Sequence, residues 1–129
     1  MSSIPVDVLA GGVIRSSDMN IVLAALRLMY GDLANPHTDY LVKATDWILL
    51  VDDSGGNVNI TLPPAIVLGK TYLICKTTSD AYHIMILPNG GDLIDGKAAM
   101  QMDTQYDKLF LMDDGNGNWM IVSSIGTPH

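Results

Sequence analysis

The sequence WILLVDDSGGNVNITL (residues 47–62) decides the fold expected for this chain. In its second half Val58, Ile60 and Leu62 alternate with polar residues, which is typical of a β-strand that buries one face. Its first half, residues 47–51, is a continuous apolar run of the length of a strand. The Asp-Asp-Ser-Gly-Gly segment between the two halves supplies turn residues, so the sequence predicts a hairpin.

The same strand-and-turn pattern continues along the chain on both sides of this stretch. A second hairpin is expected across the Asp-Asp-Gly-Asn-Gly-Asn segment at residues 113–118. We therefore expect a mainly β protein, an antiparallel β-sandwich or barrel-like domain with one N-terminal helix. The further expected strands are residues 40–43, 71–76, 83–87, 108–112 and 119–122, with a weaker one at 99–102.

The two turn segments resemble each other. Six residues recur at a constant offset: Leu50, Asp52, Asp53, Gly56, Asn57 and Ile60 match Leu111, Asp113, Asp114, Gly117, Asn118 and Ile121. An internal duplication would give this pattern. Two unrelated turns would give it as well, because Asp, Gly and Asn are favoured in turns for conformational reasons.

Three of the expected strands are apolar on both faces, namely residues 47–51, 108–112 and 119–122. One face of each strand can fill the core of the domain. The other face needs a second apolar partner, and a subunit interface would provide it.

Residues 17–30 are the one strongly helical segment. Ser17 or Asp18 can cap its first turn and Gly31 can end it. The helix is apolar nearly all round, and its apolar run of roughly 20 Å is too short to cross a bilayer. We expect it to be the hub of an oligomer, and the alternative is a helix packed on its own sheet. The expected interface residues are Met19, Val22, Leu26 and Met29 on one stripe, and Ile21 and Leu28 on a second.

Composition limits the classes of partner. A net charge of -7 and a pI of about 4.5 argue against binding to nucleic acid. No secretory signal or membrane span is expected. The expected division of the chain is an N-terminal arm and helix for attachment and oligomerisation at residues 1–38, an all-β domain at 39–125 and a tail at 126–129.

No motif in the sequence indicates catalysis. The three histidines are scattered, and the carboxylates of the turns are expected to cap local N–H groups and face water. Asp114, Asn116 and Asn118 have the spacing of the first ligands of a calcium loop, but Trp119 and Ile125 stand where glycine and glutamate are required. We expect no enzyme activity, no metal and no cofactor.

The stretch from residue 45 to 121 resembles a module common in bacteriophage fibre, spike and capsid-fibre proteins. The resemblance rests on TDWILLVDDSGGNVNITLPP, then GKTYLICK, then GDLIDG, then DGNGNWMI, in that order. It covers about three-fifths of the chain. Proteins of this kind are usually virion components, often homotrimers, and display an all-β domain outward from an N-terminal attachment region.

This resemblance implies a non-enzymatic structural protein of the virion, a homotrimeric capsid decoration or head-fibre protein. Its partners would be itself and, through the N-terminal region, the major capsid protein or another virion protein. The alternative is a short tail-associated protein that recognises host glycans. Trp47, Trp119, Tyr82 or Tyr106 would then be the stacking platforms. A third alternative, an enzyme acting on cell-wall polymer, would need paired carboxylates in a groove.

A Met29→Asp variant tests the role of the helix. If the helix joins subunits, the wild-type mass in light scattering should be near three times 13.9 kDa, and the variant should fall below it. The physical reason is that an unpaired charge is costly among apolar side chains. The strand-rich circular-dichroism spectrum should be retained. Global unfolding would instead assign the helix to the domain core, and full assembly would assign the interface to the strands.

Overall fold

The structure is a computed structural model that describes residues 31–129. Residues Asp32–His129 form one compact unit. The expected helix at residues 17–30 lies outside the described residues, and so do all six of its expected interface residues.

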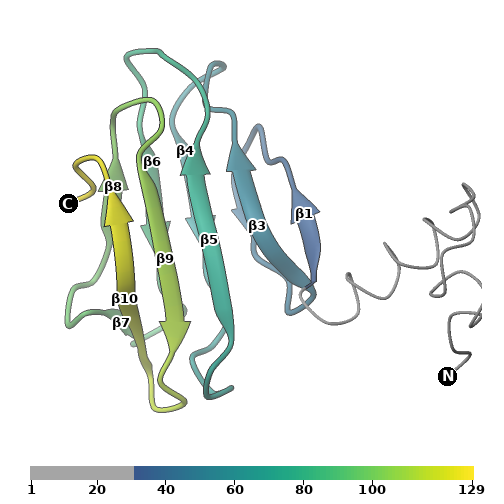
Figure 1. Cartoon of the computed structure of the whole chain (residues 1–129), viewed down its shortest axis with the longest axis vertical. Helices are drawn as coiled ribbons and strands as arrows, with labels where there is room; N and C mark the ends of the chain where they lie inside the picture. Colours follow the sequence, from purple (N-terminus) through teal and green to yellow (C-terminus); the bar gives the residue numbers. More distant parts are fainter. Residues whose placement is uncertain (1–30) are drawn as a thin grey trace, which may run out of the picture. The chain divides into compact units, whose positions relative to one another are not determined.

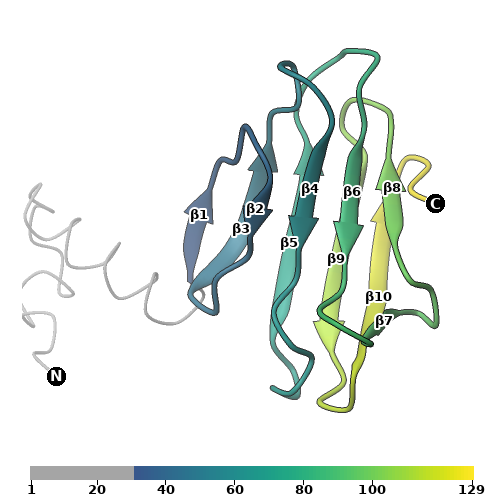
Figure 2. The same cartoon turned by 180° about the vertical axis from the view of Figure 1, so that it is seen from behind.

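The compact unit is built from two β-sheets that lie face to face (Figures 1 and 2). The larger sheet has the strand order β1 (Asp32–Ala34), β3 (Asp46–Val51), β5 (Thr71–Lys76), β9 (Lys108–Asp113), β10 (Asn118–Ile125) and β7 (Leu93–Ile94). The smaller sheet has the order β2 (Tyr40–Leu41), β4 (Val58–Thr61), β6 (Ile84–Leu87) and β8 (Met100–Met102). The expectation of a mainly β protein is therefore confirmed.

Strand direction differs from the expectation. From β1 to β9 the chain alternates between the two sheets, and the successive strands of one sheet pair in parallel up to β5 and β6. Five of the eight strand pairs are parallel, and only β5–β9, β9–β10 and β6–β8 are antiparallel. The prediction of an antiparallel sandwich was wrong because it assumed that neighbouring strands in sequence pair with each other.

The expected hairpin at residues 47–62 is an arch between the sheets. β3 and β4 belong to different sheets, and the turn between them carries Asp53, whose side chain is fully buried. The backbone N–H of Asp52 donates to the carbonyl of Pro36 at 2.9 Å, and that of Val58 donates to the carbonyl of His83 at 3.1 Å. These bonds direct the chain across the interior. The second expected hairpin, β9–β10, is confirmed.

The repeated sequence pattern forms the same local turn in two different connections. A carboxylate oxygen of Asp52 accepts the backbone N–H of Ser54, and one of Asp113 accepts that of Gly115, each two residues further on. Such turns form between any two elements, because their hydrogen bonds are local. The turn residues therefore do not determine whether an arch or a hairpin follows.

Both ends of the compact unit extend beyond the expected β domain. β1 was not expected, and it pairs with β3 from residues that had been assigned to the arm. The short strand β7 was also missed, since two residues carry no periodicity. At the other end, His129 exchanges two backbone hydrogen bonds with Gln101, so that the C-terminal residues lie beside β8.

The core lies between the two sheets. Alternate side chains of each strand point inward and are buried, which is the pattern expected of strands that share a hydrophobic layer. The larger sheet contributes Leu49, Val51, Tyr72, Ile74, Leu109, Leu111, Ile94 and Trp119. The smaller sheet contributes Val58, Ile60, Ile84, Ile86, Met100 and Met102.

Ile60 and Asn59 provide a matched test of this layer, because they are neighbours on opposite faces of β4. The Ile60 side chain is fully buried, whereas Asn59 is exposed. Ile60→Ala should lower the free energy of unfolding by about 2–5 kcal/mol, and Asn59→Ala by less than about 0.5 kcal/mol. Urea denaturation measures both. Equal effects would contradict the assignment of the inner face.

Candidate functional site

The outer face of the six-stranded sheet is unusually apolar for a surface. One row of register partners crosses four strands as Leu33, Ile48, Leu73 and Phe110, and it ends at Ser123 on the fifth. None of these side chains belongs to the core between the sheets. We call this surface the outer apolar face. It comprises Leu33, Ile48, Leu50, Leu73, Phe110, Met112, Met120, Val122 and Ile125.

The composition of this face differs in part from that of the outer side of the second sheet. Leu33, Met120, Val122 and Ile125 are each at least half exposed. The corresponding row on the outside of the four-stranded sheet is Asn59, Met85 and Gln101, in which a single methionine lies between two polar residues. The next row on the same side is Leu41, Thr61 and Leu87, and Leu41 is 73% exposed. The outer side of the four-stranded sheet therefore mixes polar and apolar residues, whereas the row across the six-stranded sheet is apolar on four successive strands.

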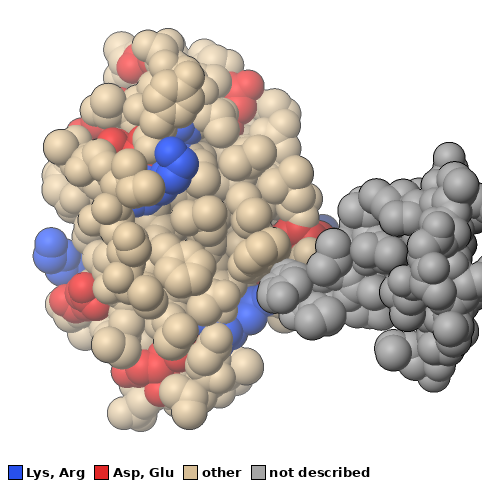
Figure 3. Space-filling view, in the orientation of Figure 1, with Lys and Arg blue, Asp and Glu red and all other residues tan. Residues whose placement is uncertain are grey.

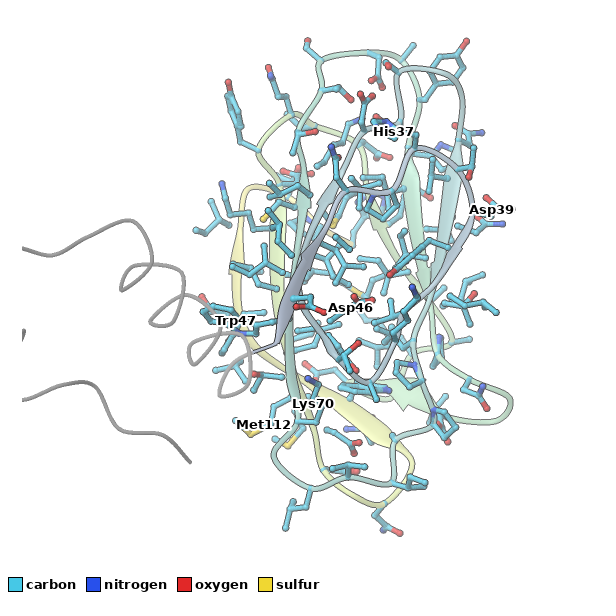
Figure 4. The ribbon with its side chains drawn as sticks, turned by 90° about the vertical axis from the view of Figure 1, so that its right-hand side faces the viewer. His37, Asp39, Asp46, Trp47, Lys70 and Met112 are labelled. Atoms are coloured by element: carbon cyan, nitrogen blue, oxygen red, sulfur yellow. The ribbon has the colours of Figure 1, made fainter. Side chains whose placement is uncertain are left out.

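The views of the molecule agree with this description. Figure 3 shows the outer apolar face as mostly tan, with the Lys, Arg, Asp and Glu side chains mainly around its rim and a blue side chain in its upper part. In Figure 4, Trp47 and Met112 extend from the side of the six-stranded sheet that faces away from the second sheet. Among residues 31–129, no element crosses this face (Figure 1). Contiguous apolar surface of this kind marks sites of protein association.

The two tryptophans considered for glycan stacking lie in different environments. Trp47 is partly buried in β3. Trp119 is 1% exposed, and its ring centroid lies 5.5 Å from that of Tyr72 in the core. A sugar cannot stack on a ring that is enclosed by protein, so the assignment of Trp119 as a stacking platform was wrong. Sequence alternation along β10 did not reveal which of its faces was the inner one.

One buried polar cluster lies where the ends of β3 and β5 meet the core. The side chain of Lys76 is fully buried, and its Nζ lies 2.5 Å from Asp53 Oδ1 and 2.9 Å from Asp80 Oδ1. Burial lowers the pKa of Lys76, but hydrogen bonds to the two carboxylates outweigh this effect and raise it. Burial raises the pKa of Asp80, yet hydrogen bonds from Lys76 and Thr78 lower it to about 2.

A second polar cluster lies at the opposite end of β3. Asp46 accepts hydrogen bonds from the Tyr40 hydroxyl at 2.6 Å and from the backbone N–H of Lys43 at 2.8 Å. Lys70 Nζ donates to the backbone carbonyl of Asp46 at 2.9 Å, and Figure 4 shows the two residues side by side. Burial, followed by the charge of Asp46, raises the pKa of Tyr72 to about 12. Each polar group here has a partner, as a structural cluster requires.

The turn carboxylates cap backbone N–H groups as expected, but several do not face water. Asp113 and Asp107 are buried, and they accept the N–H groups of Val67 and Thr127 from distant loops. Asp92 accepts that of Ala65 in the same way. These carboxylates fasten loops to the sandwich. The sequence predicted turns at Asp92 and Asp113, of which Asp113 is the last residue of β9, and it did not reveal their long-range partners.

The described residues contain no group of three metal-binding side chains. In the turn with calcium-like spacing, the carboxylate caps its own backbone, because Asp114 Oδ1 accepts the N–H groups of Asn116 and Asn118. A shallow open hollow near His37 and Asp39 is polar, and the Asp39 carboxylate in it accepts the backbone N–H of Asn59. Burial raises the pKa of the Cys75 thiol, which disfavours the nucleophilic thiolate.

Fold and surface together define a class, a two-layer β-sandwich with one apolar outer face. Comparison with protein-family models gives no match for this chain, and comparison with curated proteins gives none either. Within residues 31–129, no helix is long and apolar enough to cross a membrane.

Leu73 and Phe110 test the outer apolar face directly, because they are register partners at its centre. If the face joins subunits, the double substitution Leu73→Thr and Phe110→Thr should raise the Kd of assembly by more than about tenfold. Threonine keeps a high strand propensity, so the fold should be retained. Sedimentation or light scattering over a dilution series measures the change.

Met85→Thr is the matched control, since Met85 lies on the outer side of the four-stranded sheet. It should leave the assembly unchanged. A double variant that assembles like the wild type would exclude the outer apolar face as the interface.

Proposed function

We propose that this chain is a non-enzymatic structural protein of a bacteriophage particle, a homotrimeric capsid decoration or head-fibre protein. The observation that carries the proposal is the outer apolar face, with its row of Leu33, Ile48, Leu73 and Phe110 across four strands. Such a surface is suited to burial between identical subunits. The resemblance of residues 45–121 to phage fibre and capsid-fibre modules supplies the biological setting.

The chemistry of the described residues is in keeping with a structural role. Their buried charges have hydrogen-bond partners that hold loops and strand ends, either a charged side chain, as for Lys76 with Asp53 and Asp80, or backbone N–H groups, as for Asp107 and Asp113. The open hollow at His37 offers one imidazole, and its Nδ1 lies 3.4 Å from the carboxylate of Asp52. A general acid–base pair would need burial and a partner that positions it. We therefore favour a role in assembly over a role in catalysis.

In the proposed assembly, the sandwich is the displayed part and the N-terminal region attaches it to the major capsid protein or another virion protein. Apolar residues of the region 1–30 and the outer apolar face would together supply the contacts between subunits. The glycan-binding alternative is less favoured, because Trp119 is buried and Trp47 would be left as the only tryptophan platform.

Electron microscopy of the phage particle tests the location. An antibody or gold label on the C-terminal residue His129 should decorate the capsid shell, with groups of three copies at each site. The label is placed there because the C-terminus is exposed. Label confined to the tail would support the receptor-binding alternative, and particles without label would contradict the virion assignment.

A further inference from the structure

Lys76 and Asp53 form an unusually enclosed charge pair. Both side chains have no exposed surface, and Lys76 Nζ lies 2.5 and 2.6 Å from the two carboxylate oxygens of Asp53. Asp80, which is 12% exposed, places Oδ1 at 2.9 Å from the same nitrogen. Fully buried lysine and aspartate are rare, since both ions lose their hydration.

The distances place the nitrogen close to the carbon of the carboxyl group. Charge-assisted N–H···O bonds are usually about 2.7–2.9 Å long, and both contacts to Asp53 are shorter. A nitrogen this near to both oxygens lies about 3 Å from the carbon between them, in the plane of the carboxylate. This is the separation of reacting atoms, and a rotation of the carboxyl group about its Cβ–Cγ bond would turn the face of the carbon toward the nitrogen.

Thr78 contacts both carboxylates of the cluster. Its hydroxyl oxygen lies 2.8 Å from Asp53 Oδ1 and also 2.8 Å from Asp80 Oδ2. The hydroxyl can donate its one proton to either oxygen, and it therefore holds the two carboxylates side by side around Lys76 Nζ.

We propose that Lys76 and Asp53 condense in the folded protein to an intramolecular amide bond, with Asp80 as the group that carries the protons. The bond would join the end of β5 to the arch between β3 and β4. It is a modification of the chain itself, and it is independent of assembly and of the function proposed above.

The step balances without any other reactant. The Nζ–Cγ bond forms and one Cγ–O bond of Asp53 breaks. The Asp80 carboxylate takes protons from the nitrogen and returns them to the departing oxygen. The ammonium and the carboxylate thus become one neutral amide and one molecule of water, and no atom changes its oxidation state.

Burial provides the driving force. In water an ammonium and a carboxylate are stabilised by hydration, and condensation is unfavourable. Here both ions have lost that hydration, whereas a neutral amide is tolerated in a buried site when it is hydrogen-bonded. Fixed proximity replaces the encounter of two molecules with a step inside one molecule. The ion pair raises the pKa of Lys76 and lowers that of Asp80, so the transfer of the proton from Lys76 to Asp80 is the slow step of the condensation.

Intact-mass spectrometry of the purified full chain under denaturing conditions tests the proposal. The mass should be lower than that of the sequence by one water molecule. Trypsin should fail to cleave after Lys76, because the modified side chain is no longer a substrate. Residues 44–70 and 71–97 should therefore appear as one cross-linked species, with the link located at Asp53 and Lys76 by tandem mass spectrometry.

Lys76→Arg is the matched control, since it keeps the charge and cannot form the amide. It should show the full mass of its sequence. This control also identifies water loss by cyclisation at Asp95-Gly96 or Asp114-Gly115, which would persist in the variant. Asp80→Asn should retain the strand-rich circular-dichroism spectrum and form the bond at least tenfold more slowly.

Two results would overturn the proposal. A folded wild-type chain at its full sequence mass would show that Lys76 and Asp53 remain an ordinary ion pair. Water loss that is unchanged in Lys76→Arg would place the modification elsewhere. An Asp80→Asn variant that reacts at the wild-type rate would overturn the role given to Asp80.

Discussion

Every β-strand has two faces, and a two-layer sandwich buries only one of them. The four-stranded sheet meets this constraint in part, since its outer side mixes the polar residues Asn59, Thr61 and Gln101 with the apolar residues Leu41, Met85 and Leu87. The six-stranded sheet does not, because it carries Leu33, Ile48, Leu73 and Phe110 there. Apolar side chains on an outer face lower the free energy of the molecule only when they are covered. The proposed association of subunits follows from this imbalance between the sheets.

The two-layer arrangement also explains the buried polar clusters. A chain that changes sheet after nearly every strand must bring turns close to the interior, and their polar groups need partners there. Two lysines meet this need at the two ends of β5. Lys70 bonds the carbonyl of Asp46 at the start of β3, and Lys76 bonds Asp53 just beyond its end. β3 and β5 are thus held at both ends, in addition to their parallel ladder.

The sequence predicted the strands far better than their connections. The alternation of Val58, Ile60 and Leu62 identified β4 and its buried face, and the apolar run at residues 71–76 matched β5. The arch after β3 was read as a hairpin because its turn residues suit either connection. The deciding contact, between Asp53 and Lys76, joins residues that are distant in the sequence.

The sequence predicted the outer apolar face but not which side chains point into the core. Apolar residues on both faces of residues 47–51 and 108–112 correctly indicated an outer apolar surface, because periodicity reveals how many faces are apolar. Periodicity does not reveal which face points inward, and so Trp119 was offered as a surface residue although it belongs to the core. The expected helix residues, from Met19 to Met29, lie outside the described residues, and their role stays a prediction.

The residues of β5 divide between the core, the outer apolar face and the buried Lys76 cluster. Tyr72 and Ile74 fill the core, Leu73 lies between them on the outer apolar face, and Lys76 ends the strand in the buried cluster. Because neighbouring side chains point to opposite sides of the sheet, the outer residue can change without contact with the inner ones. Stability between the sheets and the proposed association outside them therefore rest on different residues of one strand. Under the proposed function, the outer surface could adapt to a partner while the interior stays fixed.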